Sequence, residues 1–168
     1  MRDIKLMDET LSNKIAAGEI IERPLSVVKE LVENSIDSGA TVISIDLKSS
    51  GVEDIIITDN GSGMNEDNIK LSVKRHATSK LYDEKELFKI ATLGFRGEAL
   101  ASMSAVSKFS ISSSVDGIEG YKLSIIDKEE TFEKIAFNKG TKVEVTELFF
   151  NTPVRFKHLS NPFYELAL

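Results

Sequence analysis

The order of helical and strand patterns along the chain predicts an α+β sandwich built on a largely antiparallel sheet. Apolar residues at helical spacing dominate residues 11–37, whereas alternating apolar and polar residues dominate the second half of the chain. A run of strands that follows helices favours separate layers over the strict alternation of a doubly wound fold. The chain has 168 residues, which is the length of one domain.

The longest predicted helix begins after Arg23 and stops at Gly39. Pro24 suits the first turn, because the N–H that proline lacks would have no helical partner there. Glycine is the usual residue just past the end of a helix. The apolar stripe of this helix consists of Val27, Val28, Leu31, Val32 and Ile36. Shorter helices are expected around 11–17, from a cap at Asn65 to about 75, and from Pro153.

Alternating side chains predict the strands. The first strand has Ile43, Ile45 and Leu47 on one face and polar residues on the other, which is typical of a half-buried strand. The second is a run of isoleucines that leads into Asp59. The predicted strands cover 43–48, about 55–58, 106–114, about 119–126, about 131–137 and 141–147.

Composition excludes several kinds of site. The absence of cysteine excludes thiolate zinc sites, disulfides and thiol nucleophiles. The histidines, His76 and His158, match no metal-ligand spacing. No apolar run approaches the ~20 residues that span a bilayer, and the N-terminus lacks the apolar stretch of a signal peptide. We therefore expect a cytoplasmic protein with no membrane partner.

The net charge of −6 is unevenly distributed. Residues 1–69 are strongly acidic, whereas residues 70–108 carry an excess of lysine and arginine. An acidic chain is a poor general partner for nucleic acid. A basic stretch beside an acidic one suits a site for polyphosphate and a metal ion, although scattered solvated charge gives the same counts.

The predicted long helix has an unusual polar stripe. Glu30, Glu33, Asn34 and Asp37 stand at i, i+3, i+4 and i+7, and Lys29 is expected to point away from them. Carboxylate and amide oxygens suit Mg²⁺, which takes only one or two protein ligands, and a second carboxylate could act as a general base on water. The alternative is a solvated helix face.

Two glycine-rich segments could hold a ligand. Asp59, Gly61 and Gly63 directly follow a strand, where an aspartate can accept a hydrogen bond from an amine, although Asp-Asn-Gly is also a common turn. Gly94 to Gly97 opens a helix and offers backbone N–H groups and Arg96 to an anion, or forms a plain surface loop. A Walker-type phosphate loop is absent from the sequence.

Taken together, these segments resemble a known superfamily. The strings from Glu30 to Asp37, Asp59 to Gly63, Gly94 to Leu100 and Gly140 to Thr141 resemble the four ATP-binding motifs of gyrases, heat-shock chaperones, histidine kinases and MutL proteins. The strings Asn13 to Pro24 and Arg75 to Lys80 narrow the resemblance to the MutL family of DNA mismatch repair proteins. The resemblance runs from about residue 4 to about 159.

The resemblance implies a fold and a domain organisation. The fold is a two-layer α/β sandwich in which helices cover one face of a mixed, largely antiparallel sheet, known as the Bergerat-type ATP-binding fold. Residues 1–168 would form a single N-terminal ATP-binding domain, cut before a second (transducer) domain and a C-terminal dimerisation domain.

The resemblance also implies roles for individual residues. Glu30 matches the general base that activates water for attack on the γ-phosphate, Asn34 matches the Mg²⁺ ligand, and Asp59 matches the carboxylate that specifies adenine. The other residues that match nucleotide-binding positions are Gly61, Gly63, Met64, Thr78, Lys80, Leu93, Gly94, Phe95, Arg96, Gly97, Glu98, Ala99, Leu100 and Thr141. ATP and Mg²⁺ are the expected cofactors.

The function implied is a slow ATPase switch that closes an N-terminal dimer during DNA mismatch repair. Mismatch-recognition and other repair proteins, DNA and a second copy would be partners of the full-length protein, at the bacterial nucleoid. The fragment alone is expected to be a monomer with weak or no turnover, because the second domain supplies a lysine to the γ-phosphate. The alternatives are a nucleic-acid-binding module that uses the Gly94–Gly97 loop, or another ATPase or kinase of the superfamily.

Overall fold

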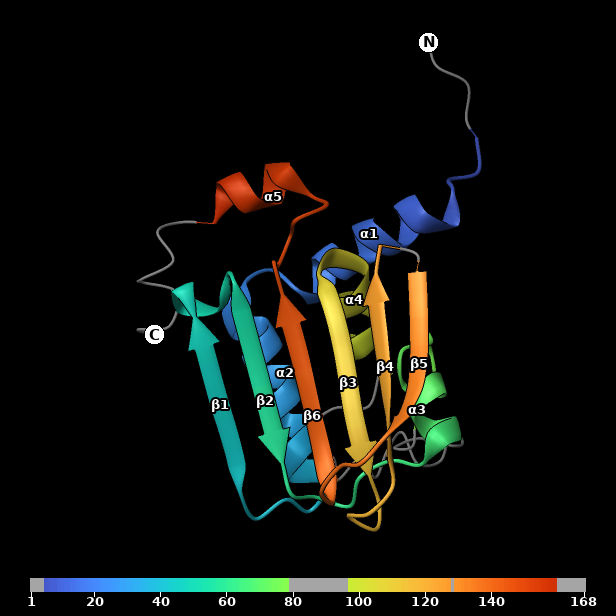
Figure 1. Ribbon diagram of the computed structural model, residues 1–168. Helices are drawn as coiled ribbons and strands as arrows, with labels where there is room; N and C mark the ends of the chain where they lie inside the picture. The colour runs from blue at the N-terminus through green and yellow to red at the C-terminus, as the bar shows by residue number, and fades with distance from the viewer. Residues whose placement is uncertain (1–4, 79–96, 128, 160–168) are drawn as a thin grey trace, which may run out of the picture.

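A six-stranded sheet is the centre of the fold (Figure 1). The computed structural model describes residues 5–78, 97–127 and 129–159. The strands lie in the order β1-β2-β6-β3-β4-β5, and each pair of neighbours is antiparallel. The predicted, largely antiparallel sheet is confirmed, although these strands contain no parallel pair of the mixed sheet that the resemblance implied. The strands are β1 (Ile43–Lys48), β2 (Asp54–Asp59), β3 (Lys108–Ser114), β4 (Gly120–Ile126), β5 (Glu129–Ile135) and β6 (Gly140–Thr146).

The helices form a second layer behind the sheet in the view of Figure 1. α2 packs against β2, α3 packs against β4, and α4 packs against β3 and α1. α5 lies beyond the end of the sheet rather than behind it (Figure 1). The helices of the described residues are α1 (Glu9–Ile20), α2 (Pro24–Asp37), α3 (Glu66–Ser72), α4 (Ala99–Val106) and α5 (Pro153–His158), and a 3-10 turn lies at Ser49–Gly51.

Local chemistry explains the ends of two helices. Pro24 occupies the first turn of α2, as predicted, and the helix ends just before Gly39, whose φ of +76° suits glycine. Asn65 caps α3, because its side-chain oxygen accepts a hydrogen bond from the N–H of Asn68 at 2.9 Å. These ends are confirmed because short-range interactions decide them.

Other boundaries differ from the prediction. Val106 ends α4 instead of beginning a strand, and β3 starts at Lys108. Val106 is fully buried, so its apolar side chain satisfies either periodicity and the pattern alone could not separate helix from strand. β5 begins two positions earlier than expected, at Glu129, because its pairing with β4 extends to Ile126.

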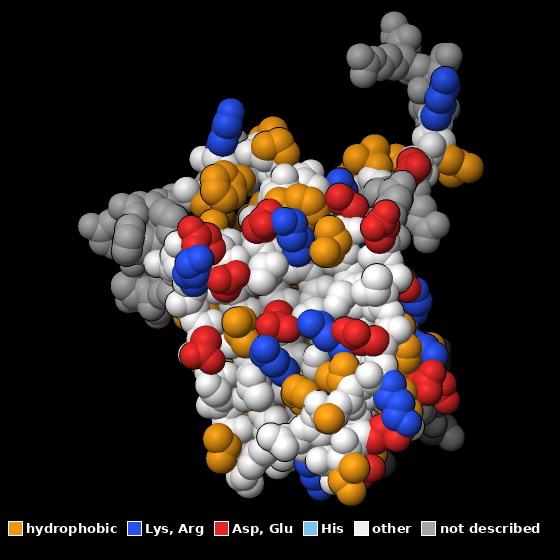
Figure 2. Space-filling model, viewed as in Figure 1, with side chains coloured by type: hydrophobic (Ala, Val, Ile, Leu, Met, Phe, Trp, Pro, Cys, Tyr) orange, Lys and Arg blue, Asp and Glu red, His pale blue; other side chains and the backbone are white. Residues whose placement is uncertain are grey.

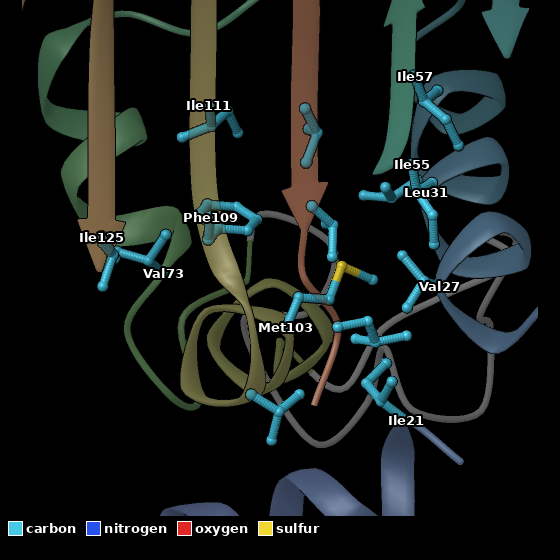
Figure 3. Close-up of a cluster of buried hydrophobic side chains, with 14 of the residues drawn as sticks. Ile21, Val27, Leu31, Ile55, Ile57, Val73, Met103, Phe109, Ile111 and Ile125 are labelled. Atoms are coloured by element: carbon cyan, nitrogen blue, oxygen red, sulfur yellow. The ribbon is translucent and has the colours of Figure 1, made fainter. Parts of the chain in front are cut away.

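The hydrophobic core lies between the sheet and the helices (Figure 3). Cross-strand pairing aligns two rows of apolar side chains on the face of the sheet that meets the helices. One row contains Ile55, Val145, Phe109 and Ile125, and the next contains Ile57, Val143, Ile111 and Leu123. Val27 and Leu31 of α2 and Met103 of α4 complete this core.

The prediction of a half-buried strand is wrong for the edge strand β1, which is more exposed than expected. Ile45 and Leu47 point to the same face as the buried Ile57 and Ile55, which are their cross-strand partners. They nevertheless remain 45% and 39% exposed. The reason is that α2 packs against β2 and leaves the outer edge of the helix-side face uncovered.

The other face of the sheet, which we call the open face, is polar. Lysine and acidic side chains are interspersed across it rather than gathered by sign (Figure 2). Lys142 pairs with Glu144 at 2.9 Å, and Ser110 donates a hydrogen bond to the same carboxylate. No helix in the described part of the chain is long and apolar enough to span a membrane.

Candidate functional site

A row of polar side chains continues the helix-side face of the sheet beyond the core. Asp59 of β2 pairs with Thr141 of β6, Thr141 pairs with Ser113 of β3, and Ser113 pairs with Tyr121 of β4. Directly paired residues in an antiparallel sheet point to the same face. These side chains therefore line one end of the sheet, next to the apolar row that contains Ile57. We call them the polar row.

Two hydrogen bonds hold the carboxylate of Asp59. The hydroxyl of Ser35 on α2 donates to Oδ2 at 2.8 Å, and the N–H of Gly61 donates to Oδ1 at 2.9 Å. Ser35 is only 3% exposed, so this bond joins the helix layer to the sheet inside the protein. Each carboxylate oxygen keeps further acceptor capacity for a ligand. The prediction that Asp59 is a site residue did not include Ser35, whose position on the buried side of α2 was the only available signal.

Ser113 joins the segments around the polar row. Its fully buried hydroxyl lies 2.8 Å from the N–H of Met64, 2.8 Å from the carbonyl oxygen of Gly140 and 2.9 Å from Oγ1 of Thr141. The predicted residues Met64 and Thr141 are thus brought together by one side chain. Nothing in the sequence distinguished Ser113 from the serines beside it.

The glycines of this region allow close contact between segments. Gly63 has a φ of +70°, and a Cβ there would collide with the carbonyl oxygen of Ser114. Gly140 has a φ of +126°, and a Cβ there would collide with the carbonyl oxygen of Asp59. Both conformations are unfavourable for other residues. The loop after β2 consequently lies directly against the ends of β6 and β3.

The polar stripe of α2 lies beside this site. Glu30 and Asn34 are half-buried on a flank of α2, and Asn34 immediately precedes Ser35, the donor to Asp59. Within the described residues, Glu30 forms no ion pair or side-chain hydrogen bond. Lys29, contrary to expectation, lies near the stripe, with Nζ 3.7 Å from Glu33. Residues four apart in a helix share a face, so the side chain of Lys29 reaches Glu33 even though Lys29 lies on the outer side of the helix.

The metal-binding potential of the described residues is limited. They contain no group of three or more His, Cys, Asp or Glu side chains that could hold a metal ion. A Mg²⁺ ion held mainly by phosphate oxygens and water does not need such a group, because one or two protein ligands suffice. The predicted Mg²⁺ ligand Asn34 is half-buried, and its role stays a prediction.

The basic segment that contains His76 contacts the glycine-rich segment that contains Gly97, as far as the structure describes the two. His76 Nδ1 lies 3.2 Å from Glu98 Oε1, and a Cβ on Gly97 would collide with the carbonyl oxygen of Ala77. Ala99 and Leu100 begin α4 and pack against the core. Thr78 is half-buried. The remaining predicted residues, Lys80, Leu93, Gly94, Phe95 and Arg96, lie outside the described residues.

A hollow of about 370 Å³ opens near the same end of the sheet. Its lining includes Thr58 and Lys142, which pair across β2 and β6 and point to the open face. The hollow therefore lies on the opposite side of the sheet from the hydroxyls of Thr141 and Ser113. Asp59 also lines the hollow, which therefore adjoins the candidate site at that residue.

Comparison with known proteins identifies the family of the chain. The profile of the family described as histidine kinase-, DNA gyrase B- and HSP90-like ATPases matches residues 22–151, most of the chain. The chain belongs to this ATPase family. The match includes Glu30, Asn34, Asp59 and Thr141. The resemblance noted in the sequence is thereby confirmed at the level of the ATPase family.

Sequence relatives of this ATPase chain are DNA mismatch repair proteins. It is 51% identical over 167 residues to the DNA mismatch repair protein MutL of Lactobacillus acidophilus, and 50% identical over 168 residues to that of Staphylococcus carnosus. Each alignment covers 99% of this chain and 26% of the relative. The chain therefore spans about a quarter of the length of these relatives.

Solved structures confirm the predicted Bergerat-type fold. The N-terminal domain of a DNA repair protein superposes with a TM-score of 0.75 at 37% identity, covering 91% of this chain and 44% of that one. The MutL ATPase domain of Aquifex aeolicus complexed with ADP gives a TM-score of 0.65 at 32% identity, covering 88% of this chain and 52% of that one. The predicted two-layer architecture of this ATPase chain is correct.

Tyr121, the β4 residue of the polar row, is predicted to lose its proton only at high pH. Its hydroxyl donates to Glu119 at 2.7 Å, and this hydrogen bond raises the pKa of Tyr121 to about 12. A raised pKa stabilises the fold below the unfolded value of about 10, and that contribution disappears as the pH rises through about 12. In ¹³C NMR titrations of labelled tyrosine, Glu119→Gln should return the pKa of Tyr121 toward about 10, whereas Glu133→Gln should not change it. An unchanged pKa in Glu119→Gln would contradict the assignment.

Proposed function

We propose that this chain binds ATP with Mg²⁺, hydrolyses it slowly, and acts as a nucleotide-driven switch in DNA mismatch repair. The observation that carries the proposal is the carboxylate of Asp59, held by Ser35 and Gly61 at the end of a sheet and beside the polar stripe of α2. Membership of the ATPase family supports nucleotide chemistry at this position. The relatives are named DNA mismatch repair proteins, which supports a role for this chain in that pathway.

Asp59 is proposed to select adenine. An ionised carboxylate only accepts hydrogen bonds, so it favours a base that offers an amino group at its edge. The bonds from Ser35 and Gly61 restrict rotation of the carboxylate and hold an acceptor in one place. A pre-oriented acceptor loses less conformational entropy when the ligand binds.

Glu30 is proposed to be the general base. A half-buried carboxylate with no ion pair among the described residues can take a proton from a water molecule. The oxygen of that water then attacks the γ-phosphorus, and the bond to the bridging β–γ oxygen breaks to release ADP. Asn34, one helical turn further along α2, would hold Mg²⁺, which neutralises phosphate charge when bound.

The switch is proposed to act through the N-terminal region. Leu6 is fully exposed, and Met7, Leu11 and Ile15 are each about half exposed. α1 packs against α4, the helix that begins within the predicted phosphate-binding string. Apolar side chains on an element connected to the nucleotide site suit an interface that forms when ATP binds. The isolated chain is proposed to be a monomer, and the full-length protein a nucleotide-dependent dimer.

The whole protein is proposed to extend beyond this domain. The chain covers 26% of its MutL relatives, which leaves room in proteins of that length for the second and C-terminal domains implied by the resemblance. DNA and mismatch-recognition proteins would be partners of that longer protein, in the bacterial cytoplasm at the nucleoid. The acidic chain alone, with a net charge of −6, should bind DNA poorly.

Calorimetric titration with a non-hydrolysable ATP analogue tests the proposed site. We expect Mg²⁺-dependent binding, and we expect Asp59→Asn to weaken binding of the adenine nucleotide by about tenfold or more, because the half-buried carboxylate is replaced by a group that can also donate. The control is Asp46→Asn, an exposed carboxylate of β1 on the open face. Equal weakening of adenine and guanine nucleotides by Asp59→Asn would contradict its role in specificity.

Glu30→Ala tests the general base in a protein that also contains the following domain of the MutL relatives. We expect hydrolysis to fall by about 100-fold or more, while binding of the ATP analogue persists, because the side chain acts on water rather than on the nucleotide. Glu33→Ala, which removes the partner of Lys29 from the same helix, is the matched control. Loss of binding in Glu30→Ala would show a structural carboxylate instead of a base.

Sedimentation velocity of the same longer protein tests the switch. The ATP analogue should convert the monomer into an N-terminal dimer. Leu11→Glu should prevent this, because dimerisation would have to bury an unpaired charge in the interface. Ile118→Glu, at a position that is 79% exposed in the turn between β3 and β4, is the control. A nucleotide-independent association state would refute the switch.

A further inference from the structure

The outer edge of β1 has no partner strand in the part of the chain that the structure describes. β1 lies at one edge of the sheet, as Figure 1 shows, and pairs with β2 on its inner side. Ile45 and Leu47 are partly exposed on the helix-side face of this strand, because α2 packs against β2 instead. An unpaired strand edge that carries apolar side chains is a template for another strand.

The hydrogen bonds to β2 show which backbone groups of β1 point outward. The carbonyl oxygen of Val42 accepts a hydrogen bond from the N–H of Asn60 at 3.3 Å, and these two residues continue the register of β1 and β2 by one position. Alternate residues of an antiparallel strand direct their N–H and C=O groups to the same neighbour. The even-numbered residues of β1 therefore bond to β2, and the odd-numbered residues present their backbone groups to the outside. The outward residues are Ile43, Ile45 and Leu47.

These outward groups suit pairing with a second copy of the same strand. In an antiparallel pair centred on Ile45, that residue lies opposite Ile45 of the second copy, and Ile43 lies opposite Leu47 of the second copy. Each of these pairs exchanges two backbone hydrogen bonds, because the backbone groups of all of these residues point outward. Two identical strands paired in this way are related by a two-fold axis.

The side chains agree with the same register. On the helix-side face, the apolar side chains of Ile43, Ile45 and Leu47 meet those of the second copy. On the open face, Ser44 lies opposite Asp46 of the second copy, so a hydroxyl donor meets a carboxylate acceptor. Like charges that lie directly opposite each other destabilise a pair of strands, and this register contains none.

The other edge of the sheet, β5, has a different character. Four of its seven residues are charged, and three of these are acidic. Charged side chains on an edge strand oppose pairing with another strand. β1 has two charged residues, Asp46 and Lys48, and both lie on the open face. Of the two edges, β1 is therefore the one that fits a second copy.

We infer that the outer edge of β1 is an interface at which two copies of this chain pair strand to strand. This interface is separate from the nucleotide site and from the proposed N-terminal dimer, which uses α1. A pair of six-residue strands is a small interface, so we expect a dissociation constant on the order of a millimolar, and the isolated chain stays a monomer at micromolar concentrations. Together the two interfaces would give each copy two separate two-fold contacts, through which dimers join into larger assemblies.

NMR of the ¹⁵N-labelled chain at increasing concentration, without nucleotide, tests the pairing. Between about 0.05 and about 1 mM, we expect translational diffusion to slow and the amide signals of Ile43, Ile45 and Leu47 to shift. The amides of Ser44 and Asp46 are internal controls, because their N–H groups already bond to β2. Their signals should shift less.

Substitutions at Ser44, an exposed position, test the register. Ser44→Lys places a cation opposite Asp46 of the second copy at two symmetry-related places, and should lower the dissociation constant by about two- to thirtyfold. Ser44→Asp places two carboxylates opposite each other and should raise the constant by a similar factor. Thr131→Lys and Thr131→Asp, which make the same charge changes at an exposed position of β5, are the matched controls and should leave it unchanged.

Each outcome decides the inference. Opposite effects of Ser44→Lys and Ser44→Asp, with no effect of the Thr131 variants, support it. A parent chain that shows no concentration dependence up to about 1 mM overturns it and leaves the edge to a strand of another protein. Equal effects at Ser44 and Thr131 also overturn it, because they would reflect the net charge of the chain. None of these measurements contains nucleotide, so the proposed function succeeds or fails separately.

Discussion

The hydrogen bond from Ser35 to Asp59 ties the helix layer to the polar end of the sheet, and the candidate site depends on it. A carboxylate in this partly buried position needs donors, because an unpaired buried charge is costly. Ser35 comes from α2 and Gly61 from the loop after β2, so the pair of donors sets the position of α2 relative to that loop. The same turn of α2 carries Asn34, the residue directly before Ser35.

The polar row explains why a site forms at this end of the sheet. Two rows of apolar side chains are covered by helices, and the third row, beginning with Asp59 and Thr141, is polar. Buried hydroxyls here are paired with one another or with backbone groups, as Ser113 is with Met64 and Gly140. A fully paired polar network is rigid, and rigidity suits the recognition of a flat base edge.

The two faces and the edge of the sheet have different characters. The open face carries interspersed charges of both signs, which gives no single-sign field for nucleic acid (Figure 2). The helix-side face is apolar up to the polar row. The edge strand β1 keeps Ile45 and Leu47 partly exposed, because α2 packs against β2 and not beyond it. The hollow near Lys142 opens on the open face and adjoins the polar row at Asp59.

The sequence by itself determined the features that depend on neighbouring residues. The limits of α2 follow from Pro24 and Gly39, the cap of α3 follows from Asn65, and the motif strings indicated Glu30, Asn34 and Asp59 as site residues. These features need only one helical turn or one strand end, so a single sequence carries them.

Only the tertiary structure decided which distant residues meet. Ser35 reaches Asp59 across 24 positions, and Ser113 reaches Met64 across 49. Such pairs depend on the strand order β2-β6-β3 and on its register, neither of which is encoded in local periodicity. The exposure of β1 likewise depends on where α2 packs. The sequence therefore predicted candidate site residues, whereas the hydrogen bonds that hold Asp59 and the part played by Ser35 and Ser113 required the assembled sheet.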